Sequence, residues 1–144
     1  MPTPGVIVNS APVLSNGWYH NRFAEATGGF YYSTFNTLQA PVSIATWTGS
    51  VPAPGRYRLE AFIPRQPSPG SAPRTNRAVY QIFPQGTGVG NFSVVNQQVS
   101  ASQWLSLGVF TFQGSYRVML ADVTGEPQAT RSVVANAIRL TPVP

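Results

Sequence analysis

The side chains that could carry acid–base chemistry in this chain are few and scattered. Its 144 residues contain one histidine, His20, and four carboxylates, at Glu25, Glu60, Asp122 and Glu126. General acid–base catalysis and glycoside cleavage both need paired titratable groups. Asp122 and Glu126 are near in sequence but lie on either side of a turn, which indicates turn-capping or solvated acids. His20 has no serine or acid at a catalytic spacing. The chain is therefore predicted not to be an enzyme.

Metal and cofactor chemistry finds equally little support in the sequence. There is no Cys, which excludes a disulfide scaffold and any thiolate metal site but leaves the redox compartment open. The Gly-rich run 86–90 lies between two predicted strands, without the helix and lysine of a phosphate loop. A flexible hairpin loop is the better interpretation, and neither a metal nor a cofactor is expected.

Aromatic residues carry the binding hypothesis. Sugar rings stack on aromatic side chains, while their hydroxyls bond to amides and guanidinium groups. Among the dense aromatics of the segment 18–35, Tyr19 and Tyr32 are the candidate ligand contacts, because their hydroxyls tolerate water. Trp47 and Trp104 are predicted to lie in the core. Aromatics in this segment cannot all be buried, since alternation sends neighbouring residues to opposite faces.

Three arginines accompany the longest irregular stretch, from Pro64 to Arg77, which contains four prolines and one glycine. Loops of this length tend to be functional or disordered. Arg65, Arg74 and Arg77 could pair bidentately with the carboxylates of uronate or pyruvate groups, so an acidic polysaccharide is the expected ligand. The alternative is that Arg77 braces the loop against a backbone carbonyl or an acid such as Glu60.

Charge alone does not predict a nucleic-acid partner. All nine basic residues are arginine, and the net charge is +5. Phosphate binding needs clustered cations, whereas Arg58, Arg117 and Arg139 stand singly in strand patterns. Charged residues make up only 9% of the chain, so the polar surface must be mostly uncharged, which is typical of secreted proteins. No nucleic-acid partner is expected.

The elements that must position these residues are strands. Period-two alternation and regular turn signals predict an all-β antiparallel two-sheet β-sandwich, jelly-roll-like, with about 8–10 strands; a closed barrel is the runner-up. Asn16-Gly17 predicts a hairpin between Val13-Leu14 and Trp18-Tyr19. The last strand is predicted to run from Val133 to Leu140, with Asn136 placed among aliphatic residues on one face. The other predicted strands cover 6–9, 30–35, 42–48, 57–63, 78–83, 92–98, 103–112 and 116–122.

The chain is predicted to be a single module, 1–144, with a core at 6–140 and Pro-rich linker stubs at Met1–Gly5 and Thr141–Pro144. No run approaches the roughly 20 apolar residues of a membrane span, and the N-terminus does not resemble a signal peptide. Either the module is cut from a longer exported protein, or it leaves the cell without a cleaved signal, as a virion protein would.

Several motifs together resemble the golvesin or xanthan-lyase carbohydrate-binding-domain-like family. The family patterns are Gly-Tyr-Tyr, Ala-x-Trp followed by Pro and Gly-x-Tyr, Asn-Arg-Ala, Asn-Gln, Gln-Trp-x-x-Leu-Gly-x-Phe-x-Phe and a closing Val-Val-Ala-Asp-Ala-Val-Arg. They match Gly29–Tyr32, Ala45–Tyr57, Asn76–Ala78, Asn96-Gln97, Gln103–Phe112 and Val133–Arg139. The resemblance implies a sugar-binding module of the kind often attached to enzymes. Two family acids are replaced, by Asn136 and at Val8-Asn9, so a tightly held calcium is not expected. Asn136 is instead expected to be a buried amide that ties neighbouring backbone.

These observations favour a non-catalytic, carbohydrate-binding-module-like recognition or adhesion domain, extracellular or at the cell surface, whose partner is a polysaccharide. The alternative is a structural subunit of a virion or an extracellular filament, which would self-associate without binding sugar.

Overall fold

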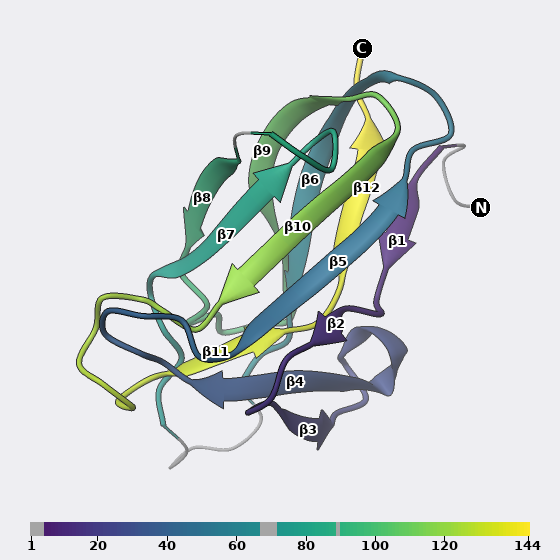
Figure 1. The fold of residues 1–144 in the computed structure, drawn as a ribbon. Helices are drawn as coiled ribbons and strands as arrows, with labels where there is room; N and C mark the ends of the chain where they lie inside the picture. Colours follow the sequence, from purple (N-terminus) through teal and green to yellow (C-terminus); the bar gives the residue numbers. More distant parts are fainter. Residues whose placement is uncertain (1–4, 67–71, 89) are drawn as a thin grey trace.

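The computed structural model describes residues 5–66, 72–88 and 90–144, and these residues form twelve strands and one 3-10 turn (Figure 1). The predicted N-terminal stub lies outside them except for Gly5, as does the middle of the predicted long loop, 67–71. No helix in the described ranges is long and apolar enough to cross a membrane.

The strands form three antiparallel sheets. The first has the order β1 (Ile7–Asn9), β12 (Ile138–Pro142), β6 (Gly55–Ile63) and β9 (Gln103–Phe112). The second has the order β2 (Val13–Leu14), β5 (Ile44–Ser50), β10 (Ser115–Ala121), β7 (Ala78–Phe83) and β8 (Asn91–Val95). The third has the order β11 (Ser132–Ala135), β4 (Phe30–Phe35) and β3 (Tyr19–Arg22), with the 3-10 turn η1 (Thr27–Gly29) leading into β4.

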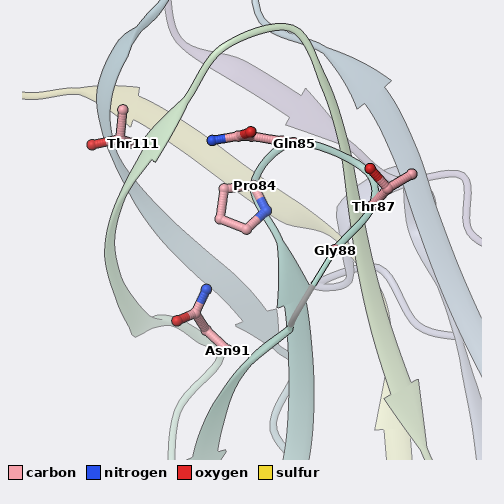
Figure 2. Close-up of a pocket in the computed structure, with 6 residues that line it drawn as sticks. All are labelled: Pro84, Gln85, Thr87, Gly88, Asn91 and Thr111. Atoms are coloured by element: carbon pink, nitrogen blue, oxygen red, sulfur yellow. The ribbon is translucent and has the colours of Figure 1, made fainter.

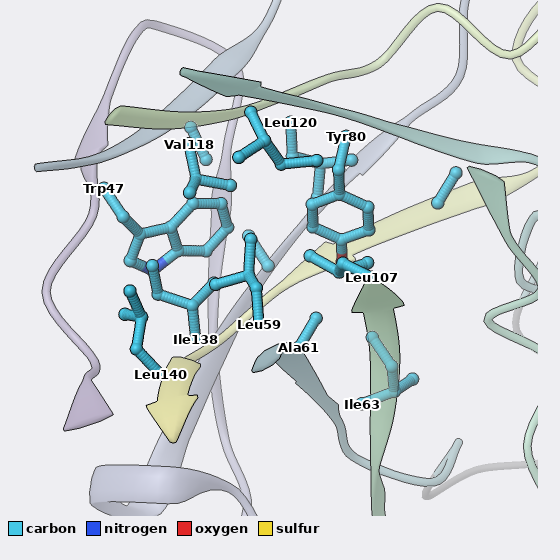
Figure 3. Packing of buried hydrophobic residues seen from close by; sticks show 14 of the residues in the cluster. Trp47, Leu59, Ala61, Ile63, Tyr80, Leu107, Val118, Leu120, Ile138 and Leu140 are labelled. Carbon is cyan, nitrogen blue, oxygen red and sulfur yellow. The ribbon is translucent and has the colours of Figure 1, made fainter. Parts of the chain in front are cut away.

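The first two sheets face each other, and the small third sheet lies across one end of them (Figure 1). The prediction of an all-β sandwich is confirmed, although the small sheet and its strands raise the strand number above the predicted ten. Alternation along each strand explains the packing, because every second side chain points between the sheets. Figure 3 shows the resulting core, to which both large sheets contribute. Its labelled members are Trp47, Leu59, Ala61, Ile63, Tyr80, Leu107, Val118, Leu120, Ile138 and Leu140.

Trp47 is a core residue, as predicted, with only 1% of its surface exposed. Its ring packs against Tyr80 with centroids 6.4 Å apart. Its indole N–H donates to the backbone carbonyl of Asn136 at 3.1 Å, so the one polar atom of the ring is satisfied inside the core. This bond links β5 to the connection between β11 and β12.

Trp104 is not a core residue, and that prediction is wrong. It is half-buried on the outer face of the first sheet, because its side chain points opposite to those of Leu105 and Leu107 along β9. The Arg139 guanidinium lies 4.3 Å from its ring centroid, and Phe62 meets it edge-on at 5.1 Å. These neighbours cover part of the ring.

The predicted single strand from Val133 to Leu140 is two strands in two sheets. β11 pairs with β4 and β12 pairs with β6, so the chain changes sheets at Asn136-Ala137. The carbonyl of Ala137 accepts a bond from the backbone N–H of Phe62 at 2.8 Å, which joins the connection to the first sheet. Residues 133–138 are all buried and no Gly or Pro interrupts the run, and for that reason the sequence pattern did not show the change of sheet.

The predicted hairpin at Asn16-Gly17 is also wrong. The turn exists, but β2 pairs with β5 and β3 pairs with β4, so the flanking strands belong to different sheets. Gly17 has a φ of +100°, and a Cβ there would collide with the Ser43 hydroxyl. The glycine is therefore required by the turn and its packing rather than by a hairpin.

Both ends of the described chain lie at the same end of the sandwich, away from the small sheet (Figure 1). β1 and β12 are antiparallel neighbours, with Ile7 opposite Leu140. β12 continues to Pro142, and Val143 donates to the carbonyl of Arg56 at 3.0 Å. The predicted C-terminal stub therefore begins later than Thr141.

Candidate functional site

The β3–β4 pair of the small sheet gathers aromatic side chains on the outside of the molecule. Its register places His20 opposite Tyr32 and Arg22 opposite Phe30. The His20 ring stacks on Phe30 with centroids 4.5 Å apart and meets Tyr32 nearly edge-on at 5.6 Å. His20 and Arg22 are exposed, whereas Phe30 and Tyr32 are half-buried.

The opposite face of the same strand pair carries two more exposed aromatics. Tyr19 is 61% exposed and Phe35 is 48% exposed, and their rings meet edge-on at 6.4 Å. Tyr31 shares this face but is buried, with Phe23 packed edge-on against it at 6.3 Å. We call Tyr19, His20, Phe30, Tyr32 and Phe35 the aromatic surface. Its residues lie on both faces of the β3–β4 pair.

Arg65 lies beside this segment, at the start of the predicted long loop. Its Nη2 atom is 2.7 Å from Glu25 Oε2, and its guanidinium lies 5.1 Å from the centroid of Phe23. The Ser102 hydroxyl donates to the other Glu25 oxygen at 2.8 Å. Hydrogen bonding to Arg65 lowers the pKa of Glu25 and, reciprocally, raises the pKa of Arg65. Both side chains remain 42% exposed, so a ligand can reach the guanidinium.

Arg74 does not face solvent, and its assignment as a ligand contact is wrong. It is 3% exposed and donates to the carbonyl of Pro64 at 2.6 Å and to that of Arg65 at 3.3 Å. Its guanidinium also lies 5.5 Å from the ring centroid of Tyr31. Burial lowers the pKa of Arg74. The side chain closes the loop on itself, a role that the spacing of loop residues could not reveal.

Arg77 is exposed but belongs to a different neighbourhood. Its guanidinium lies near Gly125, where an added Cβ would be 3.7 Å from Nη1. The acid suggested as its brace, Glu60, instead binds Arg139 at 2.8 Å. Of the three loop arginines, only Arg65 is both partly exposed and next to the aromatic segment.

All four carboxylates of the chain are engaged within the molecule. Asp122 is buried and accepts backbone N–H bonds from Val42 at 2.9 Å and Ser43 at 3.0 Å, so it binds the backbone before β5 rather than capping the turn that follows it. Glu126 accepts from the Thr75 hydroxyl and pairs with Arg131 at 3.3 Å. In the ranges described, no three His, Asp or Glu side chains gather closely enough to hold a metal ion.

Asn136 is a buried amide that ties neighbouring backbone, as expected. Its Oδ1 accepts from the N–H of Thr27 at 2.8 Å, and its Nδ2 donates to the carbonyls of Thr27 at 3.1 Å and Phe30 at 3.0 Å. These bonds fix η1 and the first residue of β4. Asn136 thereby positions the backbone that presents Phe30 to the aromatic surface.

His20 and Phe30 are site residues that sequence reasoning missed. From the sequence, His20 was considered only as a catalytic group, and alternation alone does not tell which of the aromatic residues 30–35 face outward. The signal that could have found them is the pairing of 19–22 with 30–33, which aligns His20 with Tyr32.

Hollows also lie on the described part of the molecule, away from the aromatic surface. An apolar one of about 210 Å³ lies on the outer face of the second sheet, near Phe92 and Met119. A polar one of about 290 Å³ lies at the loop between β7 and β8 and is shown in Figure 2. Neither contains a residue of the aromatic surface.

The fold defines an all-β sandwich domain with an exposed aromatic surface. The model of the Golvesin C-terminal domain matches residues 7–142, and the chain belongs to that family. Curated proteins provide no significant match.

Solved structures agree on the fold. The chain is similar to xanthan lyase of Paenibacillus, with 22% identity over 100% of this chain and 12% of that one, at a TM-score of 0.63. It is also similar to a family 35 carbohydrate-binding module of Clostridium thermocellum, with 13% identity over 94% of this chain and 98% of that one, at a TM-score of 0.65. A GH26-CBM35 β-(1,4)-mannanase of Podospora anserina has 13% identity over 99% of this chain and 28% of its own, also at 0.65. The chain thus spans a small part of the two enzymes and nearly all of the isolated module.

Proposed function

We propose that this chain is a non-catalytic recognition or adhesion domain of an exported protein, and that it binds an acidic polysaccharide through the aromatic surface. The observation that carries the proposal is the exposure of Tyr19 on the edge strand β3 and of Phe35 on the neighbouring strand β4, with the partly exposed Arg65 beside Phe23 of the same segment. Aromatic rings take the C–H faces of sugars, and a guanidinium takes a carboxylate.

The surroundings of Arg65 suit an acidic ligand. Glu25 pairs with Arg65 but leaves 42% of the Arg65 side chain exposed. Exposed ion pairs contribute little to stability, so Arg65 can also bind a ligand carboxylate. Arg22 adds a second exposed cation beside Phe30. On the face that carries His20 and Phe30, a uronate carboxylate would therefore meet the positive charge of Arg22.

An extracellular or cell-surface location follows from the same proposal. The solved structures with this fold include a xanthan lyase and a mannanase that carries a CBM35 module. Their names support polysaccharide as the ligand class and attachment to a larger exported protein as the context.

A binding experiment tests the proposal. Polyglucuronate is titrated into wild-type protein and into Tyr19→Ala, with calorimetry as the measurement. Loss of one stacking contact is expected to weaken binding about tenfold, which corresponds to roughly 1.4 kcal/mol. Phe92→Ala is the matched control, since Phe92 is 67% exposed but lies on the second sheet. Equal affinities for wild type and Tyr19→Ala would contradict the proposed surface.

A second candidate function is a structural subunit of a virion or surface filament. It is favoured by the apolar outer face of the second sheet, where several aliphatic and aromatic side chains are strongly exposed. They are Val13 at 70%, Phe92 at 67% and Val94 at 55%. Contiguous apolar patches mark protein contacts. This second function predicts that the mass measured by light scattering rises with protein concentration and that Phe92→Ser abolishes the rise. It also predicts no binding of polyglucuronate.

A further inference from the structure

The polar hollow lies at the opposite end of the sandwich from the small sheet. Its walls come from the loop after β7, from the first residue of β8 and from β9, so it spans the edge strands of the two large sheets. Figure 2 shows the side chains that line it, with the Pro84 ring between the amides of Gln85 and Asn91. Thr111 of β9, Thr87 and Gly88 complete the lining.

The polar side chains of this hollow have unused hydrogen-bonding capacity. Several amides elsewhere in the protein are engaged: Gln97, for example, donates to the Val134 carbonyl at 2.9 Å. By contrast, none of the side chains of Gln85, Thr87, Asn91 and Thr111 makes a hydrogen bond to another described residue. All four residues are exposed, so their amides and hydroxyls can bond to water or to a ligand.

Backbone contacts position the first part of this loop, residues 84–88. Gly86 and Gly88 have φ values of +79° and +90°, a conformation that only glycine adopts without strain. The N–H of Gly86 donates to the carbonyl of Phe83 at 3.0 Å, and a Cβ on Gly86 would touch the carbonyl oxygen of Ser115 at 3.4 Å. Asn91 is fixed by its pairing with Ile82. The polar groups are therefore pre-positioned, which lowers the entropy lost on binding.

The chemistry of the lining selects the ligand class. The six lining residues carry no charge, so an anionic group would form no ion pair there. Amides and hydroxyls both donate and accept, which matches sugar hydroxyls, and the proline ring offers an apolar surface to C–H groups. A volume of about 290 Å³ is at the lower end of ligand pockets and suits one ring.

We infer that this hollow is a second carbohydrate site, which binds one neutral sugar residue. It deepens the proposed function by adding a ligand class that the arginine-flanked aromatic surface does not favour. Because the two sites lie at opposite ends of the sandwich, one molecule can hold two glycan chains, or two distant parts of one chain.

NMR titration of the whole chain tests the inference with cellohexaose, mannohexaose and xylohexaose as neutral probes. At least one probe is expected to shift the amide signals of residues 85–88, 91 and 111. The double variant Asn91→Ala/Thr111→Ala should bind that probe about tenfold more weakly, the effect of one or two lost hydrogen bonds. The matched control is Asn16→Ala/Thr48→Ala, which removes an exposed amide and an exposed hydroxyl elsewhere.

Three results would overturn the inference: no shift at these residues with any neutral probe, shifts confined to the aromatic surface, or equal binding by the double variant and the control. The outcome is separable from that of the proposed function. Tyr19→Ala should leave neutral-sugar binding at the hollow unchanged, and Asn91→Ala/Thr111→Ala should leave polyglucuronate binding unchanged.

Discussion

At the scale of single residues, two tryptophans illustrate opposite uses of one polar atom. The indole N–H of Trp47 donates to the Asn136 carbonyl, whereas the buried N–H of Trp18 has no partner among the described residues. Replacing either by Phe removes the same volume. Trp47→Phe also leaves a buried carbonyl unpaired, which costs about 1–3 kcal/mol, while Trp18→Phe removes an unpaired donor.

We therefore expect Trp47→Phe to lower the free energy of unfolding by about 1–3 kcal/mol more than Trp18→Phe does. Urea denaturation of the two variants measures the difference. Equal losses would show that the Trp47 bond contributes nothing beyond packing.

The pair Glu25–Arg65 makes a prediction about pH. Hydrogen bonding to Arg65 lowers the folded-state pKa of Glu25 below the ordinary value of 4.5. A depressed pKa contributes stability that is present above the unfolded value and is lost as pH falls through the folded one. Wild-type stability should thus fall below pH 4.5 more steeply than that of Glu25→Gln. Thermal unfolding between pH 5 and pH 3 measures this, and parallel curves would argue against the pair.

Sequence reasoning placed some residues correctly because strand parity decided them. Trp47 shares its face with Ala45, and both are buried. Arg74 could not be placed this way, because its burial depends on carbonyls of its own loop, which no periodicity encodes. Trp104 was wrongly placed in the core. Alternation with Leu105, which points to the core, already indicates that Trp104 points to the outer face, whereas the size of the ring favours burial.

At the scale of elements, β9 contains a bulge that one glycine accommodates. Its pairing with β6 shifts between Leu59 and Glu60, and Gly108 there has a φ of +123°. A Cβ on Gly108 would lie 3.1 Å from the Phe110 ring. Bulges of this kind bend the strand and depend on a residue tolerant of positive φ.

Gly108→Ala should accordingly cost on the order of 1–3 kcal/mol of stability. Gly114→Ala is the control, because a Cβ there meets nothing within 4 Å. Chemical denaturation compares the two variants. A Gly108→Ala protein as stable as the control would mean that the bulge relaxes at no cost.

The strands themselves were largely predictable because alternation is a local property: 78–83 and 103–112 match the sequence prediction to the residue. Pairing partners are not local. The turn at Asn16-Gly17 is equally compatible with a hairpin and with a change of sheet, and only contacts with distant β5 and β4 decide it. For the same reason the two hollows, each built from separate elements, had no signature in the sequence.

In the molecule as a whole, each of the four carboxylates is bound within the protein, and the net charge of +5 is carried by arginine side chains. Attraction between exposed charges is screened by salt. Binding of polyglucuronate should therefore weaken as salt rises, and Arg65→Gln should flatten that dependence. Arg58→Gln, exposed on the outer face of the first sheet, is the control. Salt-independent binding, or equal slopes for both variants, would remove Arg65 from the ligand surface.

The neighbouring chain ends at β1 and β12 have a mechanical consequence. Force pulling the two ends apart would separate this antiparallel pair from one end, breaking its transverse hydrogen bonds one after another. Force between a glycan held at the small sheet and a tether at either end would instead run along the long strands, loading many bonds in shear at once. The module is thus built to resist a load applied through its ligand better than one applied through its own polypeptide.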